Sequence, residues 1–202
     1  EDIWKAFNQL QTYKDQISRL FFYNVALIIA DGADARMGSL TADKERFLKW
    51  RSVDGINRDP NGAFGSTQTL IEGFLKPETL LSIIQHFVFF ASEKNSIKML
   101  PAYHQFFAVE KAYKRALDAS SVNGDGRGGL MWHTQGAGKS LEMACLAGML
   151  GAKIDLKKIP RGKEVIRNDY LLFSETQSRF VVTVAKKDTN LHSKLILKMQ
   201  FE

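Results

Sequence analysis

A glycine-rich loop between an apolar run and a helical pattern limits the possible folds of this chain more than any other feature. It lies in "GGLMWHTQGAGKSLEMACLAG", residues 128–148. Residues 129–132 predict a short strand, residues 133–140 the loop, and residues 141–150 a helix. In this context the backbone N–H groups of the loop and the positive end of the helix bind nucleotide phosphates. The expected fold class is therefore α/β.

The loop offers a separate role for each of its last residues. Gly136 and Gly138 let the backbone approach a phosphate group closely. Lys139 would reach the terminal phosphates, and Ser140 would ligate Mg²⁺ held by the nucleotide. His133 replaces the usual leading glycine, so the strict consensus is not met. The alternative is a glycine-rich turn with a surface lysine.

Composition is compatible with a globular, cytoplasmic protein. The chain has 202 residues, of which 45% are hydrophobic, enough to bury a core. Its single cysteine, Cys145, excludes an intrachain disulfide and fits a reducing compartment. The net charge of +6 weakly favours anionic partners such as nucleic acid. The longest apolar run, residues 20–30, is too short for a transmembrane helix, so no membrane partner is expected.

Periodicity and turn residues predict alternating helices and strands along the rest of the chain. Residues 1–21 predict an amphipathic helix, and residues 22–32 and 35–41 a hairpin. The other expected elements are a third strand at 45–53, a loop and internal boundary at 54–66, helices within 69–90 (the second beginning at Pro77) and at 102–119, and strands at 152–156, 169–173 and 179–185.

Five ordered blocks resemble the DNA-translocating restriction (R) subunit of type I restriction enzymes. They are "IWKAFNQLQTYK", "GADARMGSLTADKERFLKWR", "GFLKPETLLSIIQHFVFF", "AYHQFFAVEKA" and "GLMWHTQGAGKSLEM". The resemblance covers about residues 1–140. It implies the end of a PD-(D/E)xK nuclease-like domain at 1–60 and a partial RecA-like lobe of a superfamily 2 motor at 61–140.

The same resemblance assigns roles to particular residues. Gln9 and Tyr13 match the family's Gln-x-x-x-Tyr motif, although from spacing alone they are an ordinary helix surface. Gln105 matches the family's adenine-reading glutamine, with Tyr103 as a candidate for stacking. An aromatic-rich helix that packs into the core explains Tyr103 equally well.

The resemblance implies ATP and Mg²⁺ as cofactors. It implies DNA, bound non-specifically, and the modification and specificity subunits of a restriction complex as partners. The nuclease carboxylates would precede Glu1, and no acidic ATPase motif is visible after Ser140. A nucleotide-binding but catalytically incomplete fragment is therefore expected.

A second resemblance concerns residues 141–184, which are similar to phosphoribosylformylglycinamidine synthase. It implies a chimera whose junction lies at Ser140–Glu142, with a mixed α+β segment at 141–202. In that enzyme, residues of the "SETQSR" stretch would lie near a phosphate, although a solvated turn explains them equally well: Ser174, Glu175, Ser178 and Arg179. The alternatives are thus a non-catalytic chimeric or engineered α/β scaffold, or a fragment of this purine-biosynthesis synthase.

Overall fold

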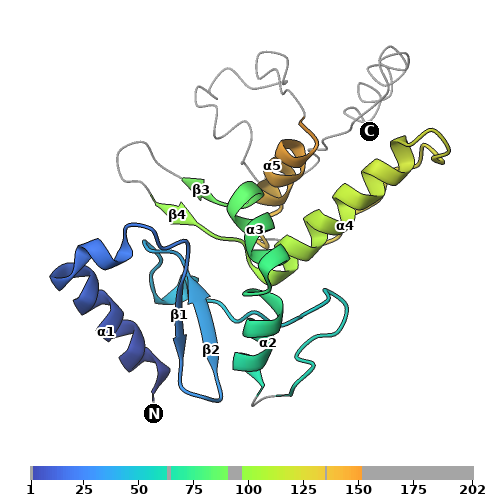
Figure 1. Ribbon diagram of the computed structural model, residues 1–202. Coiled ribbons are helices and arrows are strands. Elements are labelled where there is room, and N and C mark those ends of the chain that lie inside the picture. The colour runs from blue at the N-terminus through green and yellow to red at the C-terminus, as the bar shows by residue number, and fades with distance from the viewer. Residues whose placement is uncertain (1, 63–64, 91–96, 135, 152–202) are drawn as a thin grey trace.

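The structure, a computed structural model, combines helices with two small antiparallel sheets (Figure 1). It describes residues 2–62, 65–90, 97–134 and 136–151. The mixed α and β class is confirmed. The helices are α1 (Ile3–Gln16), α2 (Ser66–Gly73), α3 (Pro77–His86), α4 (Tyr103–Ser120) and α5 (Lys139–Met149), with 3₁₀ turns η1 (Ser18–Phe21) and η2 (Lys44–Arg46). The strands are β1 (Leu27–Ala30), β2 (Ala35–Gly38), β3 (Phe89–Phe90) and β4 (Lys98–Met99).

The predicted hairpin forms, with shorter strands than expected. β1 and β2 pair antiparallel from Leu27↔Gly38 to Ala30↔Ala35. The turn forms because the carboxylate of Asp31 accepts the N–H groups of Ala33 and Asp34, at 3.1 and 2.7 Å. Its pKa is lowered, chiefly by the hydrogen bond from the Asp34 N–H. The Asp31-Gly32 turn is thus stabilised by hydrogen bonds between neighbouring residues.

A first hydrophobic core lies between α1 and the hairpin. α1 begins where the Asp2 carboxylate accepts the N–H of Trp4, at 3.0 Å. Phe7 of this helix meets Phe47 edge to face, with ring centroids 5.0 Å apart. The buried residues of this core are Ile3, Phe7, Phe21, Leu27, Ile29 and Phe47.

The expected third strand at 45–53 was wrong beyond a single bridge between Met37 and Leu48. Asp43 accepts the N–H of Arg46 at 3.0 Å and begins the 3₁₀ turn η2. This local side-chain hydrogen bond competes with ladder formation, so the chain turns where alternation predicts extension.

A second, larger core surrounds Trp50 and joins the hairpin to four helices. The indole packs against Phe74, which directly follows α2, and Phe106 of α4, with ring centroids 5.3 and 5.7 Å away. As predicted, α2 is followed by a helix with Pro77 in its first turn. The buried members are Ala35, Met37, Trp50, Leu70, Phe74, Ile83, Phe87, Phe106, Val109 and Cys145. Residues from both sides of the predicted boundary at 54–66 therefore share one core, and the boundary itself stays a prediction.

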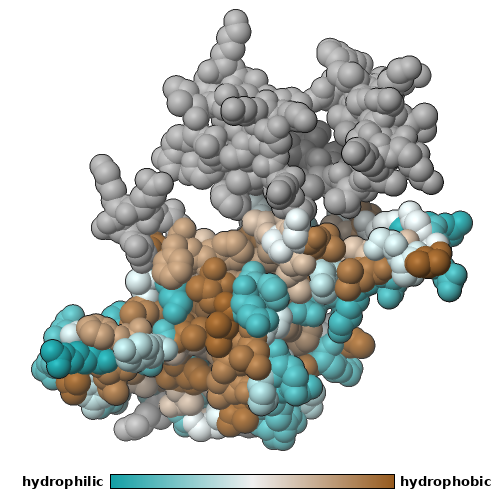
Figure 2. All heavy atoms as spheres, turned by 45° about the horizontal axis from the view of Figure 1, so that its top comes forward, coloured by the Kyte–Doolittle hydropathy of each residue, from teal (hydrophilic) through white to brown (hydrophobic). Residues whose placement is uncertain are grey.

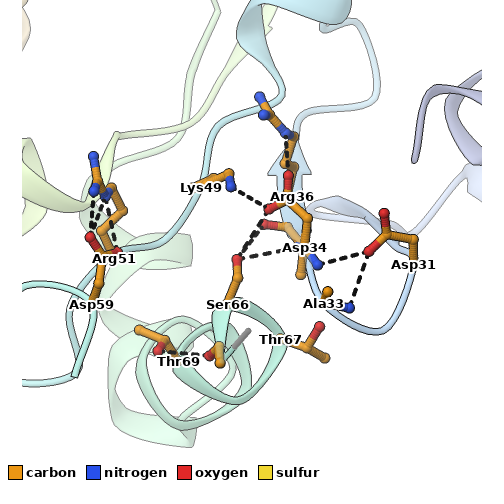
Figure 3. A network of polar contacts seen from close by, with 12 residues as sticks. Asp31, Ala33, Asp34, Arg36, Lys49, Arg51, Asp59, Ser66, Thr67 and Thr69 are labelled. Atoms are coloured by element: carbon orange, nitrogen blue, oxygen red, sulfur yellow. Dashed lines mark hydrogen bonds and ion pairs between the residues drawn. The ribbon is translucent and has the colours of Figure 1, made fainter. Parts of the chain in front are cut away.

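A polar network connects the hairpin to the start of α2 (Figure 3). Ser66 lies within 3.3 Å of both the Asp34 carboxylate and the backbone of Ala35. The carboxylate of Asp34 also forms ion pairs with Lys49 at 2.8 Å and with Arg36 at 3.4 Å. Farther along the same face, the guanidinium of Arg51 binds the carboxylate of Asp59. The contacts of Ser66 thus join the start of α2 to the hairpin.

Two short segments differ from the sequence-based expectation. The predicted strand at 129–132 is wrong, because residues 124–134 adopt no regular structure. Leu130 and Trp132 are 86% and 84% exposed, and the part of the chain that the structure describes places no strand beside them. A strand without a partner leaves its backbone groups unpaired. The small hairpin β3–β4, in contrast, was not predicted.

Apolar side chains also gather on the surface. Figure 2 shows hydrophobic residues over the middle of one face, between hydrophilic ends. The exposed large hydrophobic residues include a group after α1, namely Ile17, Leu20, Phe22 and Tyr23. The helix predicted for residues 1–21 would include Ile17 and Leu20, but α1 ends at Gln16, and both side chains are exposed. Among the helices that the structure describes, none combines the length and the apolar character needed to cross a bilayer.

Candidate nucleotide-binding site

The glycine-rich loop leads directly into α5. Gly136 and Gly138 have φ angles of 78° and 81°, in the left-handed region that favours glycine. α5 begins at Lys139, so Lys139 and Ser140 lie in its first turn, two residues earlier than predicted. The positive end of the helix dipole therefore lies where the loop ends. This arrangement can bind an anion through backbone N–H groups.

Gln105 connects the loop to α4. Its Oε1 accepts the N–H of Ala102 at 2.8 Å, which closes the first turn of α4. Its Nε2 donates to the carbonyl of Ala137 in the loop, also at 2.8 Å. A Cβ at Gly138 would come within 2.3 Å of this Nε2 atom. The backbone angle therefore favours glycine at 138, and an added Cβ would also displace the Gln105 amide from the loop.

Lys139 lies across its own loop. Its ammonium donates to the carbonyl of Thr134 at 2.9 Å and to that of His133 at 3.4 Å. The sequence predicts that this lysine reaches the terminal phosphates. The N–H groups of the Lys139 ammonium thus already donate to these two carbonyls. To bind a phosphate, the ammonium would have to leave them and donate to phosphate oxygens instead.

Two residues that sequence reasoning did not select, His133 and Glu142, meet behind the loop. The Nδ1 atom of His133 lies 2.7 Å from Oε1 of Glu142, whose side chain is 1% exposed. Burial raises the pKa of Glu142, while His133 and Lys139 oppose that shift. The His104 ring packs edge to face on His133 at 5.4 Å. The one available sequence signal was the departure from consensus, a histidine in the leading position.

A hollow of about 240 Å³ lies beside this cluster. Tyr103, His104 and Phe107 of α4 line it together with His133. Gln105 is two residues from Tyr103, and helical residues at that spacing do not share a face. Tyr103 thus faces the hollow while Gln105 reaches the loop, and their joint reading of adenine stays a prediction.

The residues present fit a nucleotide with its magnesium ion. Space is open beside the backbone of Gly136, where a phosphate oxygen would approach, and Lys139 supplies a movable positive charge. Ser140, in the first helical turn, is the residue that would ligate the ion held by the phosphates. Within the described residues, no three His, Cys, Asp or Glu side chains form a metal site of their own.

Cys145 is buried behind the loop and has no place in this chemistry. It packs into the Trp50 core from α5, and burial raises its pKa to about 12. A thiol of this kind stays protonated and unreactive.

The predicted motif at Gln9 and Tyr13 forms a unit of its own. The two side chains lie one turn apart on α1, and Gln9 Nε2 donates to the Tyr13 hydroxyl at 2.6 Å. α1 packs on the first core, whereas α5 packs against α4 and α3 (Figure 1). The structure therefore does not bring this pair together with the phosphate-type loop.

Comparison with known proteins links both regions. Residues 1–46 match the family model of the type I restriction enzyme R protein N terminus, and residues 104–169 match that of the SWI2/SNF2 ATPase. The HindI endonuclease subunit of a type I restriction enzyme from Haemophilus influenzae is 47% identical over 159 residues. That alignment covers 77% of this chain and 15% of the relative.

More distant relatives carry the same description. A Methanocaldococcus jannaschii protein, provisionally assigned as the MjaIXP endonuclease subunit, is 30% identical over 156 residues, which cover 68% of this chain and 15% of the relative. The SauCOLORF180P endonuclease subunit of Staphylococcus aureus is 28% identical over 162 residues, which cover 78% of this chain and 16% of the relative. The chain thus spans about 15% of the length of these curated relatives.

The comparisons do not support the predicted chimera. The ATPase model matches continuously from residue 104 to residue 169, across the expected junction at Ser140–Glu142. α5 also begins before that junction and packs against α4 from the preceding segment. The residues assigned to a synthase-like phosphate contact, Ser174 to Arg179, lie outside the described residues.

The N-terminal family match, the ATPase match around the glycine-rich loop and the close relative agree on one assignment. The chain belongs to the family of type I restriction enzyme R subunits, the subunits named as endonucleases.

Proposed function

We propose that this chain is the part of a type I restriction enzyme endonuclease subunit that joins the end of its nuclease-like domain to the opening of its ATP-driven motor, and that it binds Mg²⁺-ATP. The observation that carries this proposal is the geometry of residues 133–140. Two glycines with positive φ angles lead into the N-terminus of α5, and Gln105 holds the loop from α4.

Each loop residue has a defined task in this function. Backbone N–H groups at the start of α5 bind phosphate oxygens, and Lys139 leaves the carbonyl of Thr134 to neutralise their charge. Ser140 would hold Mg²⁺ beside the phosphates, where the ion would supply positive charge. An amide has two donor hydrogens and two acceptor lone pairs, and Gln105 uses one of each internally. The remaining donor and lone pair are available for the adenine edge.

The N-terminal region supports a role in DNA contact. In this proposal α1 and the β1–β2 hairpin form the end of a PD-(D/E)xK nuclease-like domain, because residues 1–46 match the R protein N terminus. Gln9 and Tyr13 lie exposed and hydrogen-bonded on α1, where they would contact the DNA backbone without sequence preference. The modification and specificity subunits are the protein partners that this assignment implies.

Calorimetric titration with Mg²⁺-ATP tests the proposal. The wild-type chain should bind in the micromolar range, and Lys139→Ala should weaken binding by at least about tenfold, since it removes a charge-assisted contact to phosphate. Lys114→Ala, which removes an exposed lysine from α4, is the matched control and should bind as the wild type. Absence of binding by a folded wild-type chain, or equal binding by Lys139→Ala, would mean that this loop does not act as a phosphate site.

A further inference from the structure

The contact between His133 and Glu142 spans the whole phosphate-type loop. His133 leads the loop, and Glu142 lies in the first turn of the helix that follows it. Their side chains meet at 2.7 Å, between Nδ1 and Oε1. The consensus glycine in the leading position has no side chain with which to make such a contact. The histidine therefore adds a connection between the two ends of the loop.

The buried surroundings of Glu142 offer its carboxylate few other hydrogen-bond partners. Glu142 is almost fully buried, and its Oε2 atom has no hydrogen-bond partner, so His133 is its one paired group among the described residues. A buried carboxylate is costly unless it is paired, which makes this geometry strongly preferred. On its other side the His133 ring packs against His104 of α4. The imidazole is thus held from two helices.

The backbone of His133 also determines where Lys139 rests. The carbonyls of His133 and Thr134 are the two acceptors of the Lys139 ammonium. A shift of His133 would move both acceptors relative to α5, and with them the space in which phosphate oxygens are received. The residue whose side chain bonds to Glu142 thus also supplies a backbone acceptor for Lys139.

We propose that the His133–Glu142 hydrogen bond is a clamp that positions the loop for nucleotide phosphates, with Glu142 as a positioning residue. This inference rests on the proposed function in that the ligand is Mg²⁺-ATP. It adds that nucleotide affinity depends on a buried pair that touches no phosphate. A bare glycine-lysine-serine motif would not reveal this dependence.

Two substitutions of Glu142 separate positioning from packing. Glu142→Gln keeps an oxygen that accepts from His133 Nδ1–H, so affinity for Mg²⁺-ATP should stay within about threefold of the wild type. Glu142→Leu is of similar size and has no acceptor, and the His133 side chain that it leaves is 22% exposed and can bond to water, so no buried charge stays unpaired. The thermal midpoint of Glu142→Leu should therefore not fall, while its affinity should drop roughly tenfold, the worth of one hydrogen bond to a charged group.

A double variant keeps the test valid if Glu142→Leu does not fold. His133→Phe combined with Glu142→Leu retains ring packing against His104 and removes both members of the pair, so no carboxylate stays buried without a partner. It should also bind Mg²⁺-ATP roughly tenfold more weakly than wild type, as expected for the same lost hydrogen bond. Wild-type affinity in a folded Glu142→Leu or double-variant protein would overturn the clamp.

A nucleotide-free measurement distinguishes failure of the clamp from failure of the proposed function. The amide signals of Gly136 and Gly138 in ¹⁵N NMR spectra of the full chain report the loop conformation directly. They should move in Glu142→Leu and stay in place in Glu142→Gln, whether or not the wild type binds ATP. If the wild type does not bind Mg²⁺-ATP, the proposed function fails, and the amide signals alone decide whether the His133–Glu142 pair positions the loop. Unchanged signals in Glu142→Leu would overturn the clamp.

Discussion

The β1–β2 hairpin and the segment before the phosphate-type loop were both predicted as extended chain, yet only the hairpin forms strands. The partners in the hairpin are close in sequence, with Ala30 opposite Ala35 across an Asp31-Gly32 turn. Residues 129–132 have no strand beside them in the described parts of the chain, and Leu130 and Trp132 face solvent. Strand formation thus follows from the availability of a partner rather than from the apolar pattern alone.

The two regions are also held in place by different forces. The hairpin is fixed by apolar burial between α1 and Phe47. The loop is fixed by polar contacts, from Gln105 to Ala137 and from His133 to Glu142. Loss of apolar contacts should therefore mainly lower stability, whereas changes at the loop should mainly alter nucleotide affinity.

The largest expected effect concerns the hairpin core. Phe47 is 1% exposed and packs against Phe7. Phe47→Ala should lower the free energy of unfolding by about 3–5 kcal/mol, through lost burial and the cavity left behind. Urea denaturation monitored by circular dichroism measures the change. The control is Phe22→Ala, at a position 69% exposed, which should differ little from wild type. A loss below about 1 kcal/mol for Phe47→Ala would contradict a packing-dominated hairpin.

An intermediate effect is expected at Gly138, where both kinds of force act. Alanine there must adopt a φ near 81° and would place its Cβ against Gln105 Nε2. Gly138→Ala should cost about 1–3 kcal/mol of stability and should also weaken Mg²⁺-ATP binding, because the Gln105 contact is displaced. Denaturation and calorimetry on the same protein measure both quantities.

The matched control for this change is Gly148→Ala within α5. No atom lies within 4 Å of a Cβ added at Gly148, and alanine favours helices over glycine by about 1 kcal/mol. Gly148→Ala should therefore be neutral or stabilising and should bind nucleotide normally. Equal behaviour of the two glycine variants would show that the loop geometry is not restricted as described.

The smallest effect is expected from a local surface contact that belongs to neither region. The carboxylate of Asp54 accepts the N–H groups of Ile56 and Asn57 at 2.8 and 2.9 Å, which lowers its pKa to about 2 from 3.8. A lowered folded-state pKa stabilises the fold above pH 3.8, and this contribution is lost as the pH falls through about 2. The wild type should lose slightly more stability than Asp54→Ala over this range. Urea denaturation at several acidic pH values measures the free energy of unfolding of both proteins. The same pH dependence in wild type and Asp54→Ala would contradict a stabilising role for the Asp54 carboxylate.

Local chemistry in the sequence was sufficient for the helices, the hairpin turn and the glycine positions. Asp2, the Asp31-Gly32 turn and Pro77 act on neighbouring backbone groups, so their effects are visible without tertiary contacts. The family resemblance over residues 1–140 also follows from ordered sequence blocks, and the comparisons confirm it. Where a local side chain competed with periodicity, as at Asp43, the expected strand was wrong.

Only the tertiary structure decided how the loop is held. The bond from Gln105 to Ala137 joins residues 32 positions apart, and His133 meets Glu142 only because the loop folds back onto α5. No periodicity or spacing encodes such contacts, since they depend on how α4 and α5 pack. The sequence by itself determined that a glycine-rich loop after His133 leads into a helix, although the helix begins at Lys139, two residues earlier than predicted. Packing determined which side chains position it, because burial of Glu142 makes its pairing with His133 energetically necessary.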